Sequence, residues 1–326
     1  MRTKKYLFNA QHDDDTFMGI AATRRNGVTK EVIRDWGEFL ALAKMDYAIN
    51  KLPALVHERT EVSEVPNQFH LVRSSDNVVV SPSTVTKQYG VLTPSDIVQE
   101  LEPFVSQGWA TPDAGFILND HSEVIVMRLD GGQLPDNGSI GGENYTHYAV
   151  VQNFHGRGSA RGRIISRRLV CDNMMRSIFS EGADFSITHR QNVKERFEWA
   201  IASWTKLQEA IKKLAEHLKL YMDFELDAAE VDATINKILA IKDGEDVSAR
   251  KQNQKEAILI AARMSPGCQG QTAFDLYNGV TWYNSHHETA RGSVLPIKRV
   301  ASFLNGSRGQ LEDRAVNVLN EMVGVE

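Results

Sequence analysis

The hydrophobic pattern of the chain changes its period between residues 170 and 190, and this change constrains the fold more than any other feature. From residue 193 the apolar side chains return at alternating spacings of four and three residues, a period typical of a helix that packs along its length. The stripe consists of Val193, Phe197, Ala200, Trp204, Leu207, Ile211, Leu214, Leu218 and Tyr221. It predicts one long helix from about 188 to 222, packed within the chain or, alternatively, paired between subunits.

Before residue 170 the chain contains short runs of β-branched and aromatic residues separated by turn-forming residues, which is the pattern of antiparallel strands. The runs lie at 67–80, 114–129, 144–154 and 161–170. Turn residues at 74–77 predict a hairpin within 67–90, and the last two runs predict a basic hairpin. Amphipathic helices are expected at about 30–45 and 93–108, the second capped by Thr93 or Ser95 and ended by Gly108.

These elements predict an α+β fold, in which a central antiparallel sheet with flanking helices precedes a mostly helical C-terminal half. We expect a mixed sheet domain with the basic hairpin at 1–185 and a helical region at 186–326 that packs on it.

Composition excludes several classes of protein. The net charge of the 326 residues is -5, so any site for an anionic partner has to be a local patch. Cys171 and Cys268 are too far apart in sequence for a disulfide framework or a zinc site built on paired cysteines, which favours a reducing cytoplasm. The start of the chain has no apolar core typical of a signal peptide, and no segment has the apolar length of a membrane span. We therefore expect a cytoplasmic protein that does not interact with membranes.

The first candidate site is a concentration of arginines at 157–176. If 161–170 is a strand, Arg161, Arg163 and Arg167 share one face and Arg168 lies on the other. Asp172 or Asn173 would cap a helix that begins at Met174, and a helix N-terminus beside guanidinium groups suits a phosphate. The predicted nucleic-acid contacts in this segment are Arg157, Arg161, Arg163, Arg167, Arg168, Asn173 and Arg176. The alternative is structural: the arginines pair with acids such as Glu100, Glu102 and Glu123 at a sheet edge.

A second basic cluster, with Arg291, Lys298, Arg299 and Arg308, follows aromatic residues near the end of the chain. Cations interleaved with aromatic rings suit single-stranded nucleic acid, because phosphates need positive charge and unstacked bases need a ring on which to stack. Lys298 and Arg299 are predicted phosphate contacts, and Trp282 and Tyr283 are candidates for base stacking. The alternative is that these aromatic residues belong to the core of a helical bundle.

Catalytic motifs are weak. Asp13, Asp14 and Asp15 or His286 could serve a metal-dependent nuclease, but adjacent residues such as His286 and His287 point in different directions on a helix. The acidic run is more typical of a solvated turn, and no nucleophile motif is present. We therefore expect no metal, no cofactor and no catalytic residue.

Several segments together resemble the phage/plasmid-like protein family known as domain of unknown function 932. They are "DYAINKLPAL" at 46–55, "GWATPDAGFILND" at 108–120, "RRLVCDNMM" at 167–175 and "DLYNGVTWYNSHH" at 275–287. The most specific residues are Arg168, Cys171 and Asn173, together with Asn278, Thr281 and His286. Members of this family are encoded by phages, plasmids and bacterial islands, often near recombination genes. The predicted architecture is also similar to that of phage single-strand annealing recombinases of the RecT, Red-beta and Rad types.

The expected function is single-stranded DNA binding in homology-directed strand annealing, by a homo-oligomeric ring or filament. Such a protein needs no nucleotide hydrolysis, and phage or host recombination proteins are its expected partners. Two other hypotheses remain open: a metal-dependent nuclease, and an anti-defence or host-interaction protein that uses the long helix as its binding face.

Overall fold

The computed structural model describes residues 35–58, 61–118, 120–133, 139–156, 158–169, 173–176, 184–242, 244, 246–286 and 296–325. The chain divides into two compact units that interleave along the sequence, whereas the sequence suggested one boundary near residue 185. Unit 1 comprises residues 1–130, 148–164 and 181–207, and unit 2 comprises 131–147, 165–180 and 208–326. Strands β6 and β7 contribute residues to both units.

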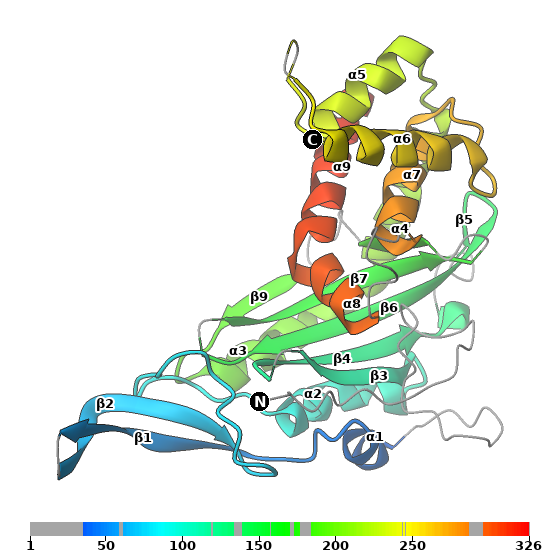
Figure 1. Ribbon diagram of the computed structural model, residues 1–326. Helices are drawn as coiled ribbons and strands as arrows, with labels where there is room; N and C mark the ends of the chain where they lie inside the picture. The colour runs from blue at the N-terminus through cyan, green and yellow to red at the C-terminus, as the bar shows by residue number, and fades with distance from the viewer. Residues whose placement is uncertain are drawn as a thin grey trace. The chain divides into compact units, whose positions relative to one another are not determined.

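Antiparallel strands and helices make this an α+β fold, as the sequence predicted (Figure 1). Within the described residues a seven-stranded sheet has the order β3-β4-β6-β7-β8, with β5 paired to β6 and β9 paired to β7. Its strands are β3 (Ala110–Leu118), β4 (Ser122–Leu129), β5 (Ser139–Ile140), β6 (Glu143–Phe154), β7 (Ser159–Arg168), β8 (Asn173–Arg176) and β9 (Phe185–Thr188). The pairs β3/β4, β4/β6, β7/β8 and β7/β9 are antiparallel.

A separate two-stranded hairpin in unit 1 consists of β1 (Ile49–Glu58) and β2 (Glu61–Arg73), and it extends from the rest of the unit as a distinct ribbon (Figure 1). The hairpin predicted within 67–90 forms only in part, as isolated bridges, because the main pairing partner of β2 precedes it in the sequence. β2 pairs with the earlier strand β1, and residues after 74 contribute only the isolated bridges Val72 to Val79 and Phe69 to Val85. The preceding strand offers a long ladder of backbone hydrogen bonds, which short-range turn signals cannot reveal.

The described part of unit 1 contains three α-helices, which are α1 (Trp36–Leu42), α2 (Pro94–Ser106) and α3 (Val193–Ala202). The start of α2 follows the sequence prediction. Thr93 is the N-cap, Asp96 completes the capping box, and Pro94 occupies the first turn. Gly108 follows the C-cap with φ of 73°, a conformation that glycine adopts without steric cost.

The predicted long helix is interrupted. Residues Ser203–Lys206 form a 3-10 turn between α3 and α4 (Leu207–Asp223). The Ser203 hydroxyl donates to the Ala200 carbonyl oxygen at 2.6 Å, an interaction that competes with regular helical hydrogen bonding. Trp204 is fully buried against the rings of Phe104 and Phe185. An uninterrupted period of apolar residues therefore conceals a change of backbone geometry at this tryptophan.

A buried polar cluster ties several segments of unit 1 together. The Glu123 carboxylate on β4 accepts hydrogen bonds from Tyr47 at 2.7 Å and Asn153 at 3.0 Å, and lies 2.7 Å from His155 Nε2. The same Asn153 amide donates to the Leu92 carbonyl oxygen. Burial would raise the pKa of Glu123, but His155 and the hydrogen-bond donors lower it below its usual value, so the cluster stabilises a charged carboxylate inside the unit.

The helices of unit 2 surround a second core. They are α4, α5 (Ala228–Ile238), α6 (Ala249–Met264), α7 (Ala273–His286), α8 (Pro296–Asn305) and α9 (Ser307–Val323). Helix α7 is buried along most of its length, and its first turn is capped by Asp275 and Thr272. Among the described residues, no helix combines the length and apolar character that crossing a bilayer requires.

The buried His189 gives unit 1 a predicted acid sensitivity. Burial lowers the pKa of His189 to about 4 from its ordinary 6.5. Between these pH values the unfolded chain binds a proton that the folded chain does not, so the free energy of unfolding falls as pH falls from 6.5 to 4. The loss attributable to His189 has an upper limit of about 3 kcal/mol. Urea denaturation across this range should show a flatter pH dependence for His189→Gln, and an unchanged slope would contradict the prediction.

Candidate nucleic-acid interface

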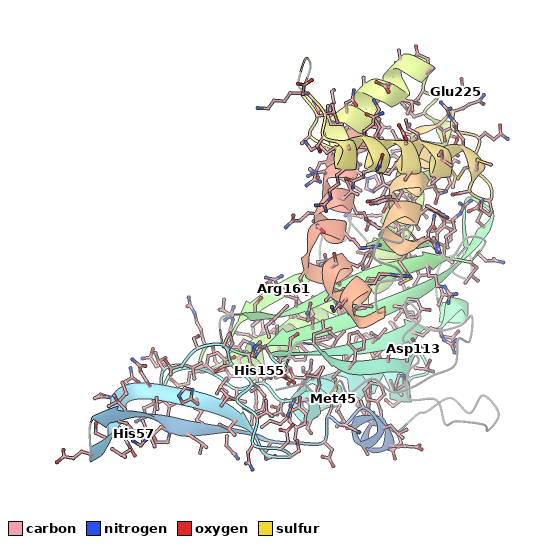
Figure 2. All side chains as sticks on the ribbon, in the orientation of Figure 1. Met45, His57, Asp113, His155, Arg161 and Glu225 are labelled. Atoms are coloured by element: carbon pink, nitrogen blue, oxygen red, sulfur yellow. The ribbon has the colours of Figure 1, made fainter. Side chains whose placement is uncertain are left out.

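The structure separates the arginines of β7 into half-exposed and buried groups. Arg161 and Arg163 in unit 1 are half-exposed, whereas Arg167 and Arg168 in unit 2 are buried. Arg161 is labelled in Figure 2. Its guanidinium lies 5.6 Å from the centroid of the Phe154 ring, and its Nε donates to Ser159 Oγ at 3.0 Å. Arg157 lies outside the described residues, and Arg176 ends β8.

Arg168 is fully buried at the centre of a structural node in unit 2. Its guanidinium forms a two-pronged ion pair with Glu143 on β6 and lies 5.2 Å from the centroid of the Phe274 ring on α7. A further nitrogen donates to the Pro266 carbonyl oxygen at 3.0 Å. Gly267, with φ of 75°, allows this close approach, because a methyl group there would lie 2.5 Å from Arg168 Nη2. In this structure the guanidinium is therefore occupied by protein groups and is not presented to a ligand.

Asn173 is also buried, and it does not cap a helix. The predicted helix from Met174 is wrong, since Asn173–Arg176 form strand β8, which pairs with Ile165–Arg168 of β7. The Asn173 amide donates to Asn278 Oδ1 on α7 at 3.0 Å, and the Met174 backbone N-H donates to Ser285 Oγ. The Asn173 amide nitrogen and the Met174 backbone N-H thus bond to α7, about a hundred residues away in sequence, whereas Asn173 Oδ1, the atom that would cap a helix, is buried without a hydrogen-bond partner among the described residues.

Cys268 lies beside the same node and is half-buried. Asn278 Nδ2 lies 3.1 Å from its sulfur. Burial raises the pKa of the Cys268 thiol to about 11, so the sulfur is protonated near neutral pH and is a poor nucleophile. Of the residues most specific to the family resemblance, Arg168, Asn173, Asn278 and Thr281 are buried in unit 2, and Cys171 lies outside the described residues.

The second basic cluster gathers around the end of α7. Arg308 of α9 donates to the Tyr283 carbonyl oxygen at 3.4 Å, and Arg299 of α8 donates to the Ser285 carbonyl oxygen at 2.9 Å. Arg250 of α6 is close enough for its charge, like that of Arg308, to lower the pKa of the Tyr283 phenol, which burial raises. We call Arg250, Tyr283, Arg299 and Arg308 the arginine patch.

Like charges are close together in this patch. Burial lowers the pKa of the Arg308 guanidinium below its usual value, and the positive charge of Arg299 lowers it further, while Tyr283 acts in the opposite direction. Arg250 is exposed, and the other three members of the arginine patch are half-exposed. One exposed and two half-exposed arginines, from three helices, thus create a local positive potential on an acidic chain.

The remaining predicted residues flank this patch. Lys298 is exposed on α8, and Trp282 is half-exposed with its ring centroid 5.5 Å from that of His286. Trp282 and Tyr283 were expected either to stack on bases at the surface or to belong to the core of a helical bundle. The structure decides for neither, because both side chains are half-exposed. The acids Asp13, Asp14 and Asp15 lie outside the described residues. Within the described part of the chain, no three His, Cys, Asp or Glu residues are placed to share a metal ion.

Sequence reasoning missed two surface residues. Arg250 was not assigned to the cluster, because it lies on α6, about fifty residues before α8. Trp199 on α3 is 80 % exposed, although tryptophan is usually largely buried. Its position off the apolar stripe of Val193, Phe197 and Trp204 was a signal that could have identified it.

The Arg168 node predicts a large effect on stability. Replacing Arg168 by alanine leaves Glu143 without its partner, and because the Glu143 side chain is 29 % exposed, the loss should lie below the about 3–5 kcal/mol typical of a fully buried pair. Urea denaturation of Arg168→Ala should show this loss. Gly267→Ala should also destabilise, and Gly244→Ala is its matched control, because Gly244 has φ of 74° but no atom within 4 Å of an added methyl group. Equal losses for the two glycine variants would show that contact with Arg168 is unimportant.

Comparison with known proteins places the chain in a family. Residues 82–304, more than half of the chain, match the model of the family described as Domain of unknown function (DUF932). This range contains the Arg168 node and much of the arginine patch. Comparisons with curated proteins and with solved structures gave no significant match. The chain therefore belongs to the family described as Domain of unknown function (DUF932).

Proposed function

We propose that this protein binds single-stranded DNA through the arginine patch of unit 2 and promotes homology-directed strand annealing. The observation that carries the proposal is the convergence of Arg250, Arg299 and Arg308, from three different helices, around Tyr283. Phosphate is a fitting ligand, because guanidinium groups bind phosphate oxygens through charge-assisted hydrogen bonds.

Gathering cations in the arginine patch has an electrostatic cost. Arg299 and Arg308 repel each other strongly enough to lower the pKa of Arg308. Both donate to carbonyl oxygens near the C-terminal end of α7, where the helix dipole favours positive charge. These hydrogen bonds position the side chains, and a polyanion that bridges them would relieve the remaining repulsion. Exposed Lys298 extends the positive surface along α8.

The aromatic residues favour a single strand over a duplex. Tyr283 and Trp282 are half-exposed beside the cations, and unstacked bases can stack on such rings at about 1–3 kcal/mol per base. Bases within a duplex are already stacked on each other and offer the protein only their edges and phosphates. Recognition by stacking and phosphate contacts is independent of sequence, as annealing of arbitrary homologous strands requires.

Only some of the arginines between residues 157 and 176 belong to the proposed DNA-binding surface, because others are buried. Arg167, Arg168 and Asn173 are not proposed to contact DNA, because the structure buries them. Arg161 and Arg163 are half-exposed in unit 1 and remain candidates for backbone contacts. The proposed setting is the bacterial cytoplasm, in phage or plasmid recombination, with the protein as a homo-oligomer that needs no nucleotide hydrolysis. The similarity to annealing recombinases remains a prediction.

Removing charge from the arginine patch should weaken binding of single-stranded DNA. Fluorescence anisotropy with a labelled oligonucleotide, measured at several salt concentrations, compares wild type with Arg299→Ala/Arg308→Ala. If both arginines contact phosphates, the double variant should bind more weakly. The slope of log affinity against log salt should become shallower by about 0.7 for each phosphate that the variant no longer neutralises. Circular dichroism establishes that the variant is folded.

A matched control removes the same charge elsewhere in unit 2. Lys212 and Lys219 are exposed on α4, and Lys212 lies 4.0 Å from Glu216, so Lys212→Ala/Lys219→Ala should cost little stability. This control should retain affinity and salt slope. Equal losses for both double variants, or no binding by wild type at low salt, would contradict the proposal. Arg161→Ala/Arg163→Ala measures the contribution of unit 1 separately.

Annealing itself is a second expected outcome. Wild type should accelerate pairing of two complementary labelled strands without nucleotide, measured by energy transfer between the labels. Arg299→Ala/Arg308→Ala should reduce this acceleration in proportion to its loss of binding. If wild type binds the single strand but slows pairing, the protein protects single strands instead, as inward stacking of bases on Trp282 and Tyr283 would produce.

A further inference from the structure

The hairpin of unit 1 exposes apolar side chains that are left uncovered by the part of unit 1 that the structure describes. The pairs Leu55 to Glu64 and His57 to Val62 place these four side chains on one face of the two-stranded sheet. Leu55 is 56 % exposed and Val62 is 54 % exposed, and Figure 2 shows His57 on this part of the hairpin. We call Leu55, Val62 and Glu64 the hairpin face. A two-stranded hairpin without a packed face is marginally stable in water, so this face gains from a partner.

The outer surface of α6 in unit 2 has the complementary composition. Ile260 is 57 % exposed and Met264 is 79 % exposed, and the two lie four residues apart on one side of the helix. Arg263 is exposed beside them, and its aliphatic stem lies against Gly270. We call Ile260, Arg263 and Met264 the α6 ridge. The opposite side of the helix carries Ile258 and Ala262, which are buried.

We propose that the hairpin face of one copy of this chain docks on the α6 ridge of a second copy. In this contact the apolar side chains of the hairpin face pack against those of the α6 ridge. The exposed carboxylate of Glu64 pairs with the exposed guanidinium of Arg263. Each surface by itself is small, but opposite charges flanking apolar centres select this pairing over contact of either surface with itself.

The two surfaces are different, so the contact is heterologous. Each copy uses its hairpin toward one neighbour and its α6 ridge toward the other, which generates a closed ring or an open filament. The inference deepens the homo-oligomer that the proposed function includes, but it does not depend on DNA binding. Prolines at Pro53 and Pro66 interrupt the edges of both strands, which favours docking through side chains over extension of the sheet by a further strand.

Glu64 also argues against DNA as the occupant. A carboxylate beside the apolar residues repels phosphates, and Glu61 adds a second negative charge at this end of the hairpin. Positive charge next to apolar side chains, as on the α6 ridge, complements the hairpin face.

Charge reversal tests the contact without DNA. The full chain is studied by sedimentation velocity as wild type, Glu64→Arg, Arg263→Glu and the double variant. Wild type should form species larger than a monomer at micromolar concentrations. Each single variant should weaken association at least tenfold, and the double variant should recover most of it. A monomeric wild type, or a double variant as weak as the sum of both singles, would overturn the proposal.

Mixing the two single variants distinguishes a second copy from the hairpin's own chain. In an equimolar mixture every junction between Glu64→Arg and Arg263→Glu molecules pairs opposite charges, so the mixture should assemble although neither variant does so alone. If the contact forms within one chain, mixing restores nothing, and the proposal of a second copy fails.

The apolar part of the contact has its own matched control. Leu55→Ser/Val62→Ser should abolish assembly, whereas Val79→Ser, at a residue of unit 1 that is 45 % exposed outside the hairpin, should not. Arg299→Ala/Arg308→Ala should assemble like wild type. Loss of DNA binding with intact assembly would then count against the proposed function alone, and loss of assembly with intact DNA binding against this inference alone.

Discussion

The ion pair between Arg168 and Glu143 is the interaction on which the organisation of unit 2 depends. A guanidinium removed completely from water has to recover its hydration energy from protein groups, and here two carboxylate oxygens, the Pro266 carbonyl oxygen and the ring of Phe274 supply it. The pair thereby fixes the position of β6, of the end of β7, of the loop after α6 and of α7. Replacing Glu143 would leave the buried Arg168 guanidinium without its countercharge.

The same residue type has two different roles in this chain because its surroundings differ. Arg168 lies where strands and a helix exclude water, so it is a structural cation with a dedicated carboxylate. Arg299 and Arg308 lie at the half-exposed end of α7, where carbonyl oxygens position them while their charge still reaches solvent. An acidic protein can therefore have a local surface for phosphates without a basic composition.

Charge complementarity connects the two proposals while keeping their sites separate. The arginine patch presents cations beside the aromatic ring of Tyr283, which suits a nucleic acid. The α6 ridge presents Arg263 beside aliphatic side chains, which suits a protein surface that carries a carboxylate. Both surfaces include residues of α6, but Arg250 lies in its first turn and Arg263 in its last. Assembly through one and binding through the other can then occur together.

The sequence by itself determined the α+β class, a helix that is capped by Thr93 or Ser95, and the cluster of cations near the end of the chain, because these follow from local periods, local caps and local charge. It did not determine that Asn173 lies in a strand or that Arg168 is buried, since their partners are 105 and 25 residues away. Only the tertiary structure decides such contacts, because burial depends on which distant segments exclude water. The exposure of the hairpin face was decided in the same way.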